Sequence, residues 1–299
     1  MNLEYVGKLS TYYETGFEGI ALILEVEDER FNIPNPNPQE GRPQFFRSLE
    51  GAIFLRKEDV LEIETPDGIR KFTLGNKILA HKHNYRFGVA YPLEINSLED
   101  LSDYIFFFKN EYKAKVIRKV NSLAFYGGTF DPIHNGHKEI ISKLHYMCDL
   151  VYVLPSNNWT KSNFTFPIQE RIRAVEAVCN NFLNVQVLDW SLSEDTSSTL
   201  NMYKKIEHET GVKAQIVIGS DNLEKITHWK HFEELNKCSF LVFTRNDLPK
   251  EIPIKNYKII NFSNNISSTA IRKEKLINNI PQEALDHLNL DLLNKKIDF

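Results

Sequence analysis

The chain has 299 residues, of which 42% are hydrophobic and 25% are charged, and its formal net charge is −4. This composition suits a globular protein with a sizeable core, and it argues against a disordered chain or a broad nucleic-acid-binding surface. No apolar run reaches the ~18–20 residues that span a bilayer, and the first residues lack the pattern of a secretory signal. Three cysteines far apart suit a reducing compartment, so we expect a soluble, cytoplasmic protein of two domains.

The first part of the chain, to about residue 112, has the pattern of a β-rich domain. Strands are predicted at 19–26, 51–56, 60–64 and 69–74. The last two flank Thr65-Pro66-Asp67-Gly68, whose residue types predict a hairpin turn. Residues 32–44 hold four prolines and one glycine, which predicts an exposed loop without regular structure. A helix is expected at 98–108, and nothing in this half indicates a chemistry.

After a basic connector at Lys113–Lys119, strands and helices alternate. Strands are predicted at 122–126, 150–154, 184–188, 214–219, 239–243 and 257–262. Helices are predicted to begin near Gly136, Pro167, Ser197, Leu223 and Ser267. Short apolar strands separated by helices are typical of a parallel sheet covered on both faces. We therefore expect a β-rich accessory domain (1–117) followed by an α/β domain (118–299) with a doubly wound, Rossmann-like parallel sheet.

The strongest chemical signal is the segment Gly127-Gly128-Thr129-Phe130-Asp131-Pro132-Ile133-His134-Asn135-Gly136-His137, directly after the first strand of the second domain. Its two leading glycines allow a tight turn that brings backbone N–H groups close to a ligand. The helix start that follows offers N–H donors and a positive dipole end, which suit phosphate. Because ligands of open α/β sheets bind at the carboxyl ends of the strands, His134 and His137 are predicted to face one crevice. The alternative is a glycine turn with two incidental histidines.

This segment resembles the signature of the nucleotidyltransferase superfamily, whose motif is (H/T)xGH. Residues Asn265–Arg272, with the sequence NISSTAIR, are similar to the superfamily's second signature, ISSTxIR. Gly219-Ser220-Asp221-Asn222-Leu223, with Trp229 eight residues after Asp221, resembles the ribose and pyridine segment of nicotinate/nicotinamide mononucleotide adenylyltransferases. The resemblance covers residues 122 to about 295.

The resemblance implies adenylyl transfer from ATP to the 5′-phosphate of nicotinamide or nicotinate mononucleotide, which gives NAD or its deamido form and pyrophosphate. It implies Mg²⁺ bound through the ATP phosphates, with no metal ligand from the protein. The catalytic residues it implies are His134, His137 and Arg272. The ATP-binding residues it implies are Gly127, Gly128, Thr129, Phe130, Lys161, Gly219, Asp221, Ser267 and Ser268. The pyridine-nucleotide-binding residues it implies are Asp195, Thr196 and Trp229.

Two segments depart from the family pattern. A proline-rich loop with a His-Lys pair is replaced here by Asn157-Asn158-Trp159-Thr160-Lys161. The Ser-Tyr-Thr of many bacterial members is replaced by Glu194-Asp195-Thr196. A carboxylate at Glu194 or Asp195 near the pyridine would disfavour the nicotinate carboxylate and favour the neutral amide.

Two alternatives stay open. One is another nucleotidyltransferase of the superfamily, either a phosphopantetheine adenylyltransferase or a cytidylyltransferase, and the other is a non-catalytic nucleotide sensor. Arg171 and Arg173, near the start of a predicted helix, are expected to be solvated charges, and the cysteines are expected in the core. We expect no nucleic-acid or membrane partner, and homo-oligomerisation is left open.

Overall fold

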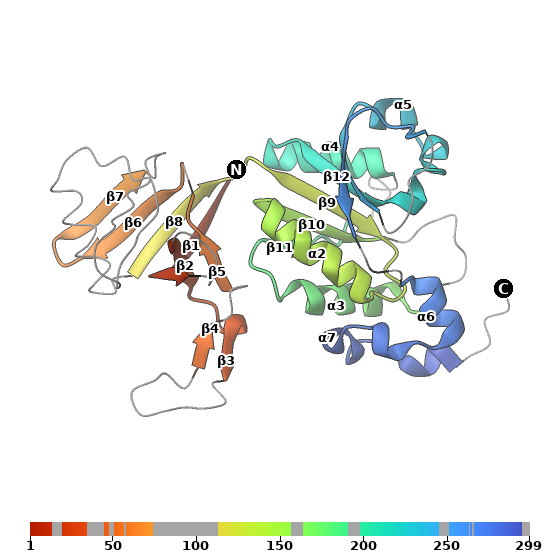
Figure 1. Ribbon diagram of the computed structural model, residues 1–299, viewed down its shortest axis with the longest axis horizontal. Helices are drawn as coiled ribbons and strands as arrows, with labels where there is room; N and C mark the ends of the chain where they lie inside the picture. Colours follow the sequence, from red (N-terminus) through yellow and green to blue (C-terminus); the bar gives the residue numbers. More distant parts are fainter. Residues whose placement is uncertain are drawn as a thin grey trace. The chain divides into compact units, whose positions relative to one another are not determined.

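The computed structural model describes residues 1–13, 20–34, 45–47, 51–56, 58–73, 113–156, 164–190, 198–244, 251–262, 264 and 266–294. The chain divides into two compact units, Met1–Val120 and Asn121–Phe299, and each contains its own six-stranded sheet (Figure 1). Within these described ranges, no helix is long and apolar enough to cross a membrane.

The sheet of the N-terminal unit is antiparallel, with the strand order β5–β2–β1–β8–β6–β7. Its strands are β1 (Asn2–Tyr13), β2 (Ile20–Val26), β5 (Ala52–Phe54), β6 (Val60–Thr65), β7 (Gly68–Thr73) and β8 (Lys113–Lys119). A short 3-10 turn, η1 (Glu29–Phe31), precedes a separate strand pair, β3 (Asn32–Pro34) and β4 (Phe45–Arg47). The predicted hairpin is confirmed by β6 and β7, in which Thr65 pairs with Gly68.

Two predictions for this unit are wrong. Lys113–Lys119 is a strand between β1 and β6 instead of a connector, because its small apolar residues Ala114 and Val116 alternate with charged residues and are buried. Asn32–Pro34 form β3, since a proline at the end of an outer strand leaves the other pairings intact. The rest of the predicted loop and the predicted helix at 98–108 lie outside the described residues.

A buried carboxylate links the β5–β6 turn of this unit to β8. Asp59 is 1% exposed, and its two oxygens accept hydrogen bonds from Nε and Nη2 of Arg118 at 2.9 and 2.6 Å. The backbone N–H of Arg56 donates to the same carboxylate at 3.0 Å. This ion pair therefore connects a turn to a central strand.

The sheet of the C-terminal unit is parallel, with the strand order β11–β10–β9–β12–β13–β14. Its strands are β9 (Leu123–Gly128), β10 (Leu150–Pro155), β11 (Val185–Val187), β12 (Ala214–Gly219), β13 (Ser239–Thr244) and β14 (Tyr257–Asn261). Numbered within the unit, the order is 3-2-1-4-5-6, which is the Rossmann arrangement, and the winding reverses between β9 and β12. The predicted doubly wound sheet is confirmed.

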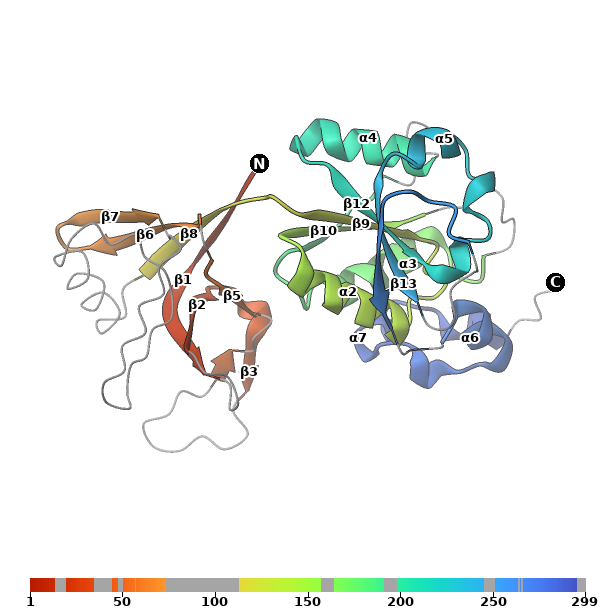
Figure 2. The same ribbon diagram turned by 45° about the horizontal axis from the view of Figure 1, so that its top comes forward.

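Helices cover both faces of this sheet, with α2 and α3 on one face and α4 on the other (Figures 1 and 2). The helices are α2 (Asn135–Met147), α3 (Ile168–Cys179), α4 (Thr199–Thr210), α5 (Phe232–Leu235), α6 (Ser268–Glu274) and α7 (Gln282–Leu285). The 3-10 turns are η4 (Ser220–Asn222), η5 (Ile226–His228), η6 (Ile277–Asn279) and η7 (Leu290–Asn294). The predicted face of α2 is confirmed, because Ile140, Ile141 and Leu144 are buried.

The helix predicted near Leu223 is wrong. The chain forms the short turns η4 and η5 there, and only the four-residue α5 follows. The buried apolar residues Leu223 and Ile226 are three positions apart, which fits the repeat of a 3-10 turn. His231 has φ of 63°, in the left-handed region, so a continuous helix cannot pass through it.

Candidate active site

The glycine-rich segment lies at the point where the winding of the sheet reverses. β9 ends at Gly128, and its parallel neighbour β12 ends at Gly219. Because the carboxyl ends of parallel strands meet at one edge, the loops after Gly128 and Gly219 leave the same edge of the sheet. A Cβ atom at Gly128 would lie 3.0 Å from the Phe130 ring, so the absence of a side chain lets this ring fold back over the strand end.

His134 and His137 cap each other at the start of α2. His134 is the N-cap residue, and its Nδ1 accepts a hydrogen bond from the His137 backbone N–H at 3.3 Å. The His137 Nδ1 accepts one from the His134 backbone N–H at 3.2 Å, and the rings stack with centroids 3.6 Å apart. An accepting Nδ1 carries no proton, so each neutral ring has its N–H at Nε2. Each ring therefore carries the kind of N–H donor that suits a phosphate oxygen.

Two aromatic rings support this histidine pair. Phe130 is 1% exposed and packs edge-on against the His137 ring, with centroids 4.9 Å apart, and against Tyr126, at 5.5 Å. Phe130 has φ of 44°, which is uncommon for a residue with a side chain. The packing of its ring holds the backbone in this conformation and gives the loop a fixed shape beside His137.

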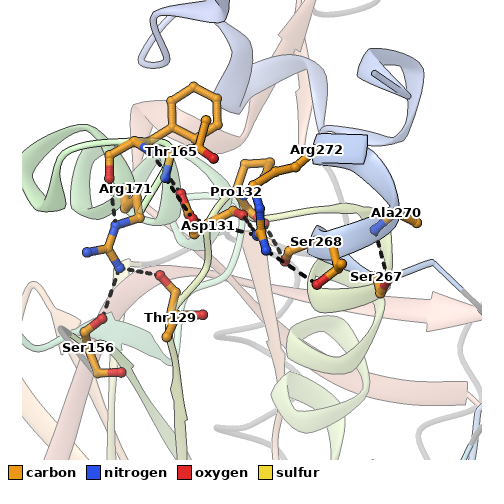
Figure 3. Close-up of polar contacts among 12 residues, drawn as sticks. Thr129, Asp131, Pro132, Ser156, Thr165, Arg171, Ser267, Ser268, Ala270 and Arg272 are labelled. Carbon is orange, nitrogen blue, oxygen red and sulfur yellow. Dashed lines mark hydrogen bonds and ion pairs between the residues drawn. The ribbon is translucent and has the colours of Figure 1, made fainter. Parts of the chain in front are cut away.

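The C-terminal motif packs against the same loop. The Ser268 hydroxyl donates to the backbone oxygen of Pro132 at 2.9 Å (Figure 3). Arg272 donates from Nη1 to the backbone oxygen of Asp131, and this nitrogen lies 3.6 Å from the Asp131 carboxylate. Ser267 caps α6, since its Oγ accepts a hydrogen bond from the third backbone N–H that follows it, at 3.1 Å. Hydrogen bonds thus join two motifs that are about 135 residues apart in the sequence.

The Asp131 carboxylate also binds the residues just before α3. Its two oxygens accept hydrogen bonds from the backbone N–H groups of Thr165 and Phe166, at 3.0 and 2.9 Å. Asp131 is 3% exposed, so this charge is held inside the protein by backbone donors and by Arg272.

The prediction that Arg171 is a solvated charge is wrong, whereas Arg173 is exposed as expected. Arg171 is 1% exposed, and burial lowers the pKa of its guanidinium while the Asp131 carboxylate opposes this change. The ring of Phe164 lies 4.4 Å from the guanidinium carbon. The sequence did hold a signal, because position 171 lies on the buried stripe of α3 that continues through Ala174, Val175 and Val178.

The remaining predicted residues lie at or after the end of β12, or outside the described residues. Gly219 ends β12, and a Cβ atom there would lie 2.3 Å from an oxygen of Asp221. Asp221 is exposed and Trp229 is partly exposed. Among the described residues, no hydrogen bond or ring contact joins Asp221 or Trp229 to the histidine pair. Lys161, Glu194, Asp195 and Thr196 lie outside the described residues.

The parts of the chain that the structure describes contain no group of three or more His, Cys, Asp or Glu side chains that could hold a metal ion. The arrangement around α2 offers N–H donors and guanidinium charge instead, which suit the oxygens of phosphate groups.

Residues 125–274 match the family model described as Cytidylyltransferase-like. A curated relative from Sulfurimonas denitrificans, named probable nicotinate-nucleotide adenylyltransferase, is 30% identical over 169 residues, which cover 55% of this chain and 91% of that protein. A protein of the same name from Aliarcobacter butzleri is 30% identical over 178 residues, covering 56% and 96%. The solved structure of Plasmodium falciparum nicotinic acid mononucleotide adenylyltransferase complexed with NaAD is 19% identical, with a TM-score of 0.49, and covers 56% of this chain and 94% of that one.

Proposed function

The chain belongs to the cytidylyltransferase-like family of nucleotidyltransferases, and we propose that it transfers the adenylyl group of ATP to the 5′-phosphate of a pyridine mononucleotide. The products are pyrophosphate and NAD or its deamido form. The main evidence for the proposal is the contact between the two motifs. Ser268 and Arg272 bind the loop that leads to the histidine pair at the start of α2. The names of the curated relatives support a role in NAD biosynthesis.

In the proposed reaction, an oxygen of the mononucleotide phosphate attacks the α-phosphorus of ATP. A bond forms between these two atoms, and the bond from the α-phosphorus to the oxygen that bridges it to the β-phosphorus breaks. Pyrophosphate leaves with the electron pair. The attacking phosphate is already ionised at neutral pH, so the reaction needs no general base. The protein contributes alignment and donors for the charge on the phosphate oxygens.

The groups at the start of α2 suit this task. We assign the Nε2–H donors of His134 and His137 to the ATP phosphates, with His137 at the α-phosphoryl group. Arg272 provides a planar fork of N–H donors for the β- and γ-phosphates. The first turn of α2 contains no acidic residue, so no side-chain carboxylate there opposes the positive end of the helix dipole.

The nucleotide substrate in this proposal is MgATP. Mg²⁺ prefers oxygen ligands and keeps several waters, so phosphate oxygens hold it without a cage of protein side chains. When bound, the ion reduces the charge repulsion between the two phosphate groups that must meet.

Two acceptors fit the proposal, nicotinate mononucleotide and nicotinamide mononucleotide. The names of the curated relatives favour nicotinate mononucleotide. The carboxylates of Glu194 and Asp195 favour the neutral amide if either lies near the pyridine. A direct comparison of the two acceptors is therefore needed.

Pyrophosphate release by the full-length protein tests the proposal. The assay contains ATP and Mg²⁺ with nicotinate mononucleotide, nicotinamide mononucleotide, phosphopantetheine or no acceptor. Release that depends on either pyridine mononucleotide is the expected result, and the ratio of the two kcat/KM values measures the preference for acid or amide. Release with phosphopantetheine alone, or with no acceptor at all, would contradict the proposal.

A further inference from the structure

A buried arginine binds the loop after β9 through its backbone. Arg171, in the first turn of α3, donates from Nη1 to the backbone oxygens of Thr129 and Ser156, at 2.5 and 2.9 Å (Figure 3). Its Nε donates to the backbone oxygen of Phe166 at 3.1 Å. One guanidinium thus joins the loop after β9, the residue after β10 and the residues before α3. Arg171 therefore fixes three backbone oxygens relative to one another.

The bond to Thr129 sets the direction of the next backbone donor. In a trans peptide the C=O and N–H groups point to opposite sides, so the Phe130 N–H points away from Arg171. No oxygen of a described residue accepts a hydrogen bond from this N–H, although Phe130 is 1% exposed. Buried backbone donors are nearly always paired, so this N–H is a donor that an oxygen atom from outside the described residues can use.

A second arginine binds a backbone oxygen two residues further along the chain. Arg272 binds the backbone oxygen of Asp131, while Arg171 binds that of Thr129. The two carbonyl groups on either side of Phe130 are therefore each held by a guanidinium, and the residue between them has the left-handed φ of 44°. The Asp131 carboxylate lies near both positive charges and keeps their repulsion low.

We propose that Arg171 is a positioning residue of the ATP site, which holds the Thr129 carbonyl so that the Phe130 N–H faces a phosphate oxygen of ATP. The inference rests on the proposed function and adds to it a residue that does not touch the nucleotide. Because Arg171 fixes a donor that ATP uses when it binds, its loss weakens ATP binding specifically. The affinity for the mononucleotide stays the same.

The test compares two methionine variants of the full-length protein. Arg171→Met keeps an unbranched apolar side chain of similar length and removes every donor, and Arg173→Met makes the same change at an exposed position of α3. The Kd for MgATP is measured by calorimetry without acceptor. The KM values for ATP and nicotinate mononucleotide are measured by pyrophosphate release at a temperature at which near-ultraviolet circular dichroism shows each variant folded.

We expect the Kd and KM for ATP to rise at least tenfold in Arg171→Met, with the KM for the mononucleotide within twofold of wild type and Arg173→Met unchanged. If Arg171→Met does not fold, Arg171→Lys, which keeps the charge beside Asp131, takes its place. A rise of at least threefold in the Kd and KM for ATP is then expected. A Kd for ATP within twofold of wild type in the folded variant, or an equal rise in both KM values, would overturn the inference.

The same experiment separates this inference from the proposed function. If the wild type binds ATP but releases no pyrophosphate with any pyridine mononucleotide, the proposed function fails, and the calorimetry still decides the role of Arg171. If the wild type binds no ATP, both are overturned.

Discussion

The Nδ1 atoms of His134 and His137 each accept a hydrogen bond from the backbone N–H of the other residue, at 3.3 and 3.2 Å. The pair therefore has two separable roles. The Nδ1 atoms cap the first turn of α2, and the Nε2 atoms carry the N–H protons of the neutral rings. Substitutions that imitate only one of these nitrogens separate helix stability from chemistry.

His137→Asn keeps an acceptor at the position of Nδ1 and removes the Nε2 donor. We expect turnover to fall by about 10²–10³-fold, the usual effect of losing one donor to a developing oxyanion. The melting temperature should change by only a few degrees, because the cap is retained. His208→Asn, at an exposed position in the last turn of α4, is the control and should leave both unchanged. Turnover of His137→Asn close to that of wild type would contradict the role of His137.

Arg272→Lys keeps the charge in the last turn of α6 and replaces a planar fork of donors by a single ammonium. The variant should raise the KM for ATP by about tenfold or more, because a lysine cannot bind the Asp131 oxygen and phosphate oxygens in the same geometry. Steady-state kinetics at varied ATP measure this effect. Arg173→Lys applies the same change at an exposed position, and an equal KM in the two variants would show that the fork of Arg272 plays no part.

Asp59→Ala should destabilise the N-terminal unit. The substitution leaves the Arg118 guanidinium, whose side chain is 11% exposed, without its carboxylate, and breaking a buried ion pair from one side costs about 3–5 kcal/mol. Hydrogen exchange of the β6 and β8 amides measures the free energy of local opening. Glu62→Ala removes the partner of Lys71 in an exposed pair and should change that free energy far less. Equal effects of the two substitutions would refute this account of Asp59.

Stability should fall as the pH rises above 9. Burial raises the pKa of the Cys148 thiol from its ordinary value of 9.0 to about 11, and burial also raises the pKa of Cys179. Between pH 9 and 11 the unfolded chain releases the Cys148 proton and the folded chain keeps it, so unfolding is favoured by roughly 1.4 kcal/mol per pH unit from this group. Below pH 9 both states keep the proton, and its contribution to stability is fully present.

Urea unfolding at several pH values from 8.5 to 10.5, with a reducing agent present, measures this slope. Cys148→Ala should reduce the slope of the unfolding free energy against pH by the contribution of about one proton, since the alanine variant has no thiol to ionise at this position. Identical slopes in the wild type and the variant would exclude Cys148 as a source of the pH dependence.

Regular patterns in the sequence are sufficient to predict much of the fold of the C-terminal unit. The apolar spacing of Ile140, Ile141 and Leu144 predicts the buried face of α2, and the short apolar runs predict the six parallel strands. Four of the seven residues of Lys113–Lys119 are charged, which predicts a connector, and only the alternation of Ala114 and Val116 indicates the strand that forms there.

The contacts within the site could not be predicted in the same way. Arg171 was missed because arginine is seldom buried, and its partners are backbone oxygens that no side-chain pattern reveals. The reciprocal histidine cap likewise depends on the φ and ψ of the loop, and the contact of Arg272 with Asp131 depends on how two distant segments pack. The residue types of the motifs predict that these groups bind phosphate, while the hydrogen bonds that position them require the structure.

An isotope label in ATP follows the adenylyl group itself through the proposed reaction. The full-length protein is incubated with Mg²⁺, ATP labelled with ¹³C in its adenosine, and unlabelled nicotinate or nicotinamide mononucleotide, and the products are identified by mass. The proposed adenylyl transfer predicts a labelled dinucleotide in an amount equal to the pyrophosphate released. Pyrophosphate released without labelled dinucleotide, or the absence of both products, would contradict it.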